Sequence, residues 1–164
     1  MRIIAIDPGN KQSAMVIIDA DTLRPLEMHL MPNEDLQMYI KCLRCDETDR
    51  AAIEMLQSYG MPIGRDVLDT AVWIGRFFET LKRKMYYEPD YVYRKDEKTH
   101  ICQDSRAKDT NIRQALINRF CTHDFKFGKG TKDDPDWFTG FRKDMWAAYA
   151  VGLTYVETIL RKEH

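Results

Sequence analysis

The sequence predicts an α/β protein built on a mixed β-sheet. Short apolar runs rich in isoleucine and valine open the chain, whereas later segments repeat apolar residues at helical spacing. The expected order is three strands, a helix, a strand, a helix, a strand and two helices, and such alternation is typical of an α/β fold. The 164 residues are enough for a single domain, residues 1–164, with a sizeable core.

The first three strands are expected to form an antiparallel meander. Arg2 to Asp7 reads RIIAID and Ser13 to Asp19 reads SAMVIID. Between them, Pro8-Gly9-Asn10-Lys11 has the composition of a turn. Arg24 to Met31 is predicted to be the third strand.

A helix, a strand and a second helix are predicted next. Asn33 to Leu43 has apolar residues at helical spacing, and Arg50 to Leu56 reads RAAIEML, a buried strand with one charge. Gln57 to Gly64 is punctuated by glycine and proline, which predicts a loop. Residues 65–84 predict a long amphipathic helix, whose apolar stripe is Val67, Ala71, Ile74, Phe78 and Leu81.

Residues 90–160 predict one strand and two helices. Asp90 to Arg94 is the expected fifth strand, and Lys108 to Cys121 the next helix. Residues 125–140 are rich in Gly, Lys and Asp and predict a mobile loop. Asp144 to Leu160 predicts a final helix that is apolar nearly all round between Met145 and Leu153, so we expect it to pack deeply against the sheet. This apolar stretch is too short to span a membrane, and the start of the chain does not resemble a secretory signal.

Charge is unevenly distributed although the net charge is only −1. Residues 76–132 carry fourteen Lys and Arg against eight Asp and Glu, whereas residues 1–75 carry seven against twelve. The last 32 residues carry four against six. A basic middle segment suits contact with phosphates, and acidic flanks suit cation binding. The alternative is that the basic run is only a solvated face.

The four cysteines leave two interpretations. Cys42 and Cys45 form a C-x-x-C pair, and a zinc site would need two further ligands from Cys102, Cys121 or His123. The spacing matches no familiar zinc module, so we expect four reduced thiols in an intracellular protein.

Three carboxylates occur where a charge is costly. Asp7 ends the first strand, Glu54 lies within a buried strand, and Asp144 begins an apolar helix. Each has a simpler explanation, because Asp7 could brace the turn, Glu54 could pair with an arginine and Asp144 could cap its helix. Together they predict a site for two hard cations, Mg²⁺ or Mn²⁺, with Asp7 bridging both ions, Glu54 holding one and Asp144 the other.

Four short segments add a resemblance to a known family. They are Ile6-Asp7-Pro8-Gly9, Ala52-Ile53-Glu54, Ser105-Arg106-Ala107-Lys108 before a helix, and Asp144 followed by Met-Trp-Ala-Ala-Tyr-Ala. In this order and spacing the chain resembles RuvC-type Holliday junction resolvases, and the phage-associated branch in particular. The resemblance implies an RNase H-like fold, a metal-dependent endonuclease of bacterial or phage-infected cytoplasm, and Lys108 as the residue that stabilises phosphate charge.

The resemblance has a gap at the last motif. The family usually has two ligands one helical turn apart, whereas a match at Asp144 leaves Ala147 at the second position. In the other register Asp144 is the second ligand and Phe141 occupies the first. A loop carboxylate could reach in from upstream, the candidates being Asp133, Asp134 and Asp136.

A resolvase must also hold four-way DNA. The basic residues expected to contact phosphates are Lys82, Arg83, Lys84, Arg94, Lys95, Lys98, Arg106 and Lys108. Tyr59, in the loop after Glu54, either stacks on an unpaired base at the junction or packs on the neighbouring helix. Resolvases of this type are usually homodimers, and the face of residues 65–84 with Trp73 and Phe77 is a candidate contact surface.

Three other functions compete with this prediction. A related nuclease acting on flaps, other branched DNA or RNA–DNA hybrids would use the same carboxylates. The sugar-kinase and actin-like class also carries an Asp-x-Gly turn, but it needs two such domains and the chain is too short for both. A non-catalytic nucleic-acid-binding protein on the same fold is the third, and the missing fourth ligand keeps it open.

Overall fold

The computed structural model describes residues 1–58, 60 and 62–162, and its strands form one mixed five-stranded sheet in the order β3-β2-β1-β4-β5. The first three strands are antiparallel neighbours, whereas β1–β4 and β4–β5 are parallel pairs. The predicted α/β class and mixed sheet are therefore confirmed. The strands are β1 (Arg2–Asp7), β2 (Gln12–Asp19), β3 (Pro25–Pro32), β4 (Arg50–Met55) and β5 (Asp90–Tyr93).

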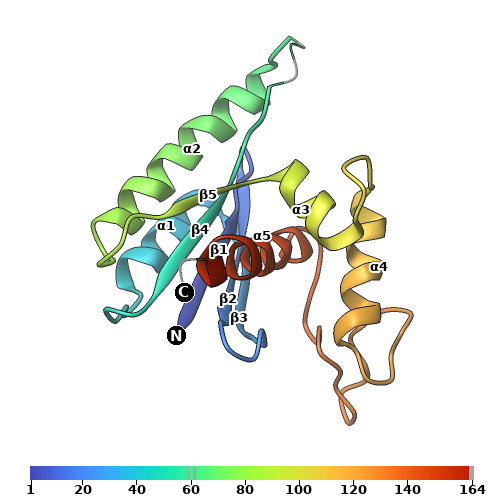
Figure 1. Cartoon of the computed structure of the whole chain (residues 1–164). Coiled ribbons are helices and arrows are strands. Elements are labelled where there is room, and N and C mark those ends of the chain that lie inside the picture. The colour runs from blue at the N-terminus through green and yellow to red at the C-terminus, as the bar shows by residue number, and fades with distance from the viewer. Residues whose placement is uncertain (59, 61, 163–164) are drawn as a thin grey trace.

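Helices cover both faces of this sheet (Figure 1). α1 and α2 pack on one face, and α5 packs on the other with α3 and α4 beside it. We call these the α1/α2 face and the α5 face. The helices are α1 (Asn33–Cys42), α2 (Arg65–Lys82), α3 (Arg94–Cys102), α4 (Asp109–Phe120) and α5 (Met145–Thr158), and a short 3₁₀ helix spans Leu160–Lys162.

The central strand β1 is buried on both sides. Side chains alternate along a strand, so Ile3 and Ala5 join the apolar cluster on the α5 face, while Ile4 and Ile6 join the cluster on the α1/α2 face. This double burial explains why the segment reads as an almost continuous apolar run.

α5 lies unusually close to the sheet at Gly152. A Cβ added there would be 2.5 Å from Ile18 Cδ1 and 2.9 Å from Ala5 Cβ, so only glycine fits. This close approach fixes where α5 crosses β1. No helix among residues 1–58, 60 and 62–162 is both long and apolar enough to cross a membrane.

The structure corrects the predicted face of α2. Ile74 and Leu81 are buried as expected, but Val67 is 40% exposed. Trp73 and Phe77 belong to the core on the α1/α2 face rather than to a spare contact surface. The N-terminal half of α2 extends past the strands (Figure 1), and its large exposed apolar residues are Val67, Leu68 and Val72.

The structure also differs from the predictions after β5 and in residues 125–140. Helix α3 was not predicted, and it follows β5 directly, so the strand ends at Tyr93 rather than Arg94. Residues 125–140 form no helix or strand, but they are not loosely held, because Gly130 bridges to Pro135 and Phe138 is completely buried.

Candidate functional site

Asp7 and Glu54 lie side by side at one edge of the sheet. β1 and β4 are parallel, and their register pairs Ile6 with Ile53, so the next residues on both strands are neighbours. Strand alternation turns Asp7 toward the same face as Ala5, and Glu54 toward the same face as Ala52. Both carboxylates therefore belong to the α5 face.

These two carboxylates interact with each other. Burial raises the pKa of Asp7 well above its ordinary value, and the charge of Glu54, a hydrogen bond with Glu54 and the charge of Asp144 raise it further. Burial also raises the pKa of Glu54, although the Arg94 guanidinium opposes this shift. A hydrogen bond between two carboxyl groups needs a proton on one of them, so without a cation the pair resists full ionisation.

Asp144 joins the pair from the start of α5. It occupies the N-cap position, but its side chain makes no capping hydrogen bond. The simple capping explanation therefore does not account for this carboxylate. Its charge acts on Asp7, so the structure brings together the three residues that the sequence singled out.

The donor set suits a hard cation, since the candidate ligands are all carboxylate oxygens. As they stand, however, the described side chains include no group of three or more His, Cys, Asp and Glu arranged around one metal position. The four cysteines, for their part, lie at or just beyond the ends of α1, α3 and α4.

Arg94 is the cation that the structure places beside these acids. Its Nη1 lies 4.0 Å from Glu54 Oε2 and donates to Glu97 Oε2 at 2.6 Å, while Nη2 donates to Asp109 Oδ1 at 2.6 Å. The expectation that Glu54 pairs with an arginine is thus met alongside its place in the acidic cluster.

Glu97 is the site residue that the sequence did not reveal. It lies in the first turn of α3, and its ionisable side chain is completely buried. One oxygen, Oε1, has no hydrogen-bond partner among the residues that the structure describes. The only signal in the sequence was the spacing of Arg94 and Glu97, three residues apart on a helix face.

Two cavities flank Arg94. The larger, about 250 Å³, lies against Glu54 and is lined by Lys95, Lys98 and Ser105 as well as Arg94. The smaller, about 80 Å³, lies against Asp144 and includes Ala147 and Asp109. Of the predicted phosphate contacts, Arg94, Lys95 and Lys98 are therefore at the acidic cluster.

Lys108 and Arg106 lie near this region at the surface. Lys108 is the exposed N-cap residue of α4, and its backbone N–H donates to Asn111 Oδ1 at 2.9 Å. It immediately precedes Asp109, the partner of Arg94, so it is beside the cluster without being part of the ion-pair network. Arg106 is exposed and faces Asp104 at 3.7 Å.

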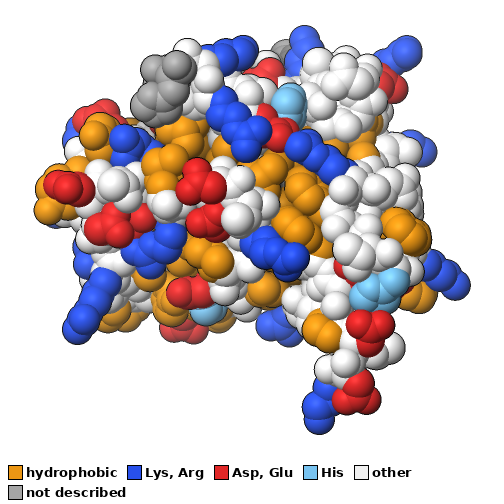
Figure 2. All heavy atoms as spheres, turned by 60° about the horizontal axis from the view of Figure 1, so that its bottom comes forward, with side chains coloured by type: hydrophobic (Ala, Val, Ile, Leu, Met, Phe, Trp, Pro, Cys, Tyr) orange, Lys and Arg blue, Asp and Glu red, His pale blue; other side chains and the backbone are white. Residues whose placement is uncertain are grey.

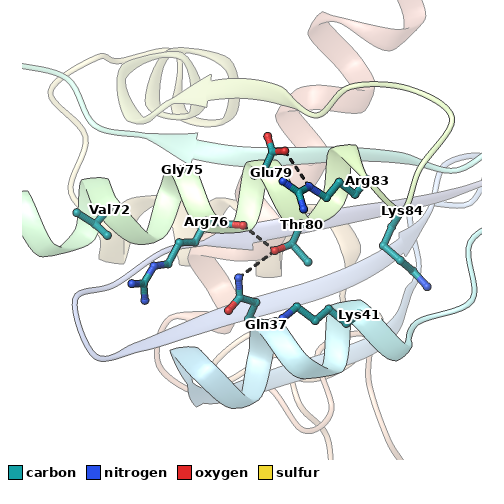
Figure 3. Close-up of a pocket in the computed structure, with 9 residues that line it drawn as sticks. All are labelled: Gln37, Lys41, Val72, Gly75, Arg76, Glu79, Thr80, Arg83 and Lys84. Atoms are coloured by element: carbon teal, nitrogen blue, oxygen red, sulfur yellow. Dashed lines mark hydrogen bonds and ion pairs between the residues drawn. The ribbon is translucent and has the colours of Figure 1, made fainter.

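The remaining basic candidates lie elsewhere. Lys82 pairs with Glu88 at 2.5 Å. Arg83 and Lys84 line a groove of about 540 Å³ between α1 and α2, together with Lys41 and Arg76 (Figure 3). This groove is on the α1/α2 face, opposite the acidic cluster. On the face shown in Figure 2, basic, acidic and apolar side chains are interspersed rather than sorted by charge.

Other predicted residues do not reach the cluster. Asp136 accepts hydrogen bonds from the backbone N–H groups of residues 122–124, and these contacts lower its pKa despite its burial. Asp134 faces His123 at 3.4 Å, and Asp133 is exposed. Phe141 is buried in the core of the α5 face. Tyr59 lies outside the described residues.

Comparison with known proteins supports the fold. No family model matches the chain, and no curated protein sequence matches it. Solved structures do match, among them Thermus thermophilus RuvC, with a TM-score of 0.60, and T. thermophilus RuvC in complex with a Holliday junction substrate, with a TM-score of 0.65. Each is 12% identical to this chain, covers 94% of it, and is itself covered over 93% and 92% of its length, respectively. The predicted RuvC-like, RNase H-like fold is confirmed.

Proposed function

We propose that this protein is a metal-dependent, structure-selective DNA endonuclease that resolves four-way junctions by phosphodiester hydrolysis. The observation that carries the proposal is the meeting of Asp7, Glu54 and Asp144 at one edge of a RuvC-like sheet. A solved structure with this fold is in complex with a Holliday junction substrate, which favours branched DNA as the substrate class.

The three carboxylates would hold Mg²⁺ or Mn²⁺, with Asp7 between the other two. Two such ions would supply an activated water and stabilise the leaving oxygen of the phosphodiester. In the reaction, the water oxygen forms a bond to phosphorus and gives up a proton, the bond from phosphorus to the leaving deoxyribose oxygen breaks, and that oxygen takes up a proton. The acids contribute by being ionised and fixed, and the crowding of Asp7 against Glu54 favours cation binding because a cation relieves their repulsion. Lys108 would stabilise charge on the phosphate from the start of α4.

We further propose that the active form is a homodimer, because two symmetric cuts need two sites. The exposed apolar residues of α2 are the supporting observation, with Leu68 56% and Val72 55% exposed beyond the edge of the sheet. Leu68→Asp should leave the fold intact and shift a dimer to monomer in analytical ultracentrifugation. A wild-type chain that sediments as a monomer at micromolar concentration would remove this proposal.

The test is cleavage of labelled four-way, flap, RNA–DNA hybrid and linear substrates with Mg²⁺ or Mn²⁺, beside Asp7→Asn. We expect paired nicks in the four-way substrate, and none from the variant. Preferential cleavage of flaps, other branched DNA or hybrids would keep the metal site and replace the substrate.

A non-catalytic DNA-binding protein is the second candidate. The observations that favour it are the alanine at position 147 and the contact of Arg94 with Glu54. Salt-sensitive junction binding that survives Asp7→Asn, with no metal-dependent cleavage by the wild type, would select it.

A further inference from the structure

Glu97 occupies a position where an ionisable side chain is unfavourable, because it is completely buried. A buried carboxylate with one unpartnered oxygen costs free energy, and the neighbouring charge of Glu54 adds repulsion. Buried ion pairs are often no better for stability than apolar side chains of similar size. The position of Glu97 therefore calls for a reason other than stability.

Within the described part of the chain, the Glu97 side chain forms one hydrogen bond, and its partner is Arg94. Glu97 Oε2 accepts from Nη1 at 2.6 Å, and Asp109 Oδ1 accepts from Nη2 at 2.6 Å, so the guanidinium is held from two sides. These two bonds use two of the five N–H donors of an arginine. The Arg94 side chain stays 24% exposed and lines both cavities, one beside Glu54 and one beside Asp144.

The cavity beside Glu54 has the charge that an incoming phosphate requires. Arg94, Lys95 and Lys98 line it, and Ser105 adds a hydroxyl donor. Neither lysine forms an ion pair within 4.0 Å among the residues that the structure describes. An anionic phosphodiester could approach Glu54 only where cations offset the carboxylate charge, and this cavity provides them.

We propose that Arg94 binds a phosphate of the DNA strand to be cut, and that Glu97 is a positioning residue that holds the guanidinium at this place. Lys95 and Lys98 complete a phosphodiester-binding subsite on the Glu54 side. This inference rests on the proposed function and deepens it, because it assigns the scissile strand to one side of the acidic cluster.

The first test measures binding without cleavage. A labelled four-way junction is titrated with protein in EDTA at several salt concentrations between 50 and 200 mM. Arg94→Gln should weaken binding about 10-fold and lower the slope of log affinity against log salt by about one, as expected for the loss of one phosphate contact. Arg94→Lys, which keeps the charge, should retain the slope. Wild-type affinity and slope in Arg94→Gln would overturn the proposal.

The second test asks whether Glu97 acts through Arg94. Glu97→Gln keeps the arginine charge, so the salt slope should stay unchanged while the single-turnover cleavage rate falls about 10-fold. The double variant Arg94→Gln/Glu97→Gln should behave like Arg94→Gln alone, because there is no guanidinium left to position. Losses that simply multiply would show that Glu97 acts independently and would overturn its assigned role.

The control is a second arginine–glutamate pair on the α5 face. Arg119 contacts Glu157 at 2.5 Å, their side chains are 46% and 10% exposed, and neither residue lines the two cavities beside Arg94. Glu157→Gln should leave the slope of log affinity against log salt unchanged and the single-turnover cleavage rate within twofold of wild type. If the wild type cleaves no DNA while Arg94→Gln still lowers the salt slope, the nuclease proposal fails and the phosphate subsite stands. If the wild type cleaves the junction and Arg94→Gln leaves cleavage unaffected, the nuclease proposal stands and the phosphate subsite fails.

Discussion

The two faces of the sheet differ in the side chains that β1 and β4 present to them. On the α1/α2 face, β1 and β4 present bulky side chains such as Ile4, Ile6 and Ile53, and the cluster there is apolar. On the α5 face the same strands present Ala5 and Ala52, followed at the strand ends by acids. Small residues let α5 approach closely, and this approach brings Asp144 to the acids at the ends of the strands. Both faces bury an apolar core, the more extensive one on the α5 face, but the candidate chemistry lies only on the α5 face.

The largest expected effect tests this difference between the faces at two neighbouring residues of β4. Glu54→Gln should lower junction cleavage by roughly 10²- to 10³-fold, the scale of losing one electrostatic stabiliser, and should not destabilise the protein because it removes repulsion with Asp7. Ile53→Val, on the opposite face, should cost about 0.5–1.5 kcal/mol of unfolding free energy and leave the cleavage rate nearly unchanged. Cleavage rates and urea unfolding measure the two effects. A Glu54→Gln protein that unfolds more easily yet cleaves normally would contradict the assignment of the candidate chemistry to the α5 face.

The next largest effect concerns glycines on the two faces. Gly152→Ala places a Cβ against Ala5 and should cost about 1–2 kcal/mol, because overpacking outweighs the better helix propensity of alanine. Gly75→Ala on α2, where an added Cβ meets nothing within 4 Å, should instead stabilise the protein by up to about 1 kcal/mol. Thermal unfolding compares the two variants with wild type. Equal effects would mean that α5 does not pack as closely as described.

The last expected effect is the pH dependence of the cation-free protein. The folded-state pKa of Asp7 is raised, so the folded state keeps a proton that the unfolded state has released. Its contribution to stability is therefore present below the ordinary aspartate pKa of about 3.9 and is lost as the pH rises toward the raised value, by at most about 1.4 kcal/mol per pH unit. In EDTA, unfolding free energies from pH 4 upward should fall more steeply for wild type than for Asp7→Asn. Parallel curves would mean that Asp7 is not crowded by Glu54 and Asp144.

The sequence was most informative where burial is continuous. β1, β2 and β4 are short apolar runs, and the acids that interrupt or end them stand out, so Asp7 and Glu54 were found together with the sheet. Asp144 was found because the helix after it is apolar on nearly every side. In these segments, local pattern and tertiary environment agree.

The missed features depend on contacts that no local pattern encodes. α3 has no apolar stripe, and its one fully buried residue is Glu97, a charged side chain that normally indicates solvent. The stripe on α2 was misplaced because its N-terminal half extends beyond the sheet, so apolar residues there are not buried by this chain. Residues 125–140 looked mobile by composition, but Asp124 accepts hydrogen bonds from the backbone N–H groups of Phe127, Lys129 and Gly130, and holds the turn.

The most direct measurement is the mapping of cut positions in a four-way junction whose strands are labelled one at a time, with Mg²⁺ and with EDTA. The account predicts Mg²⁺-dependent nicks at symmetric positions in two opposing strands, absent in EDTA and in Asp7→Asn. Cleavage that continues in EDTA, or that Asp7→Asn leaves intact, would contradict the claim that the carboxylates of the α5 face form a metal-dependent nuclease centre.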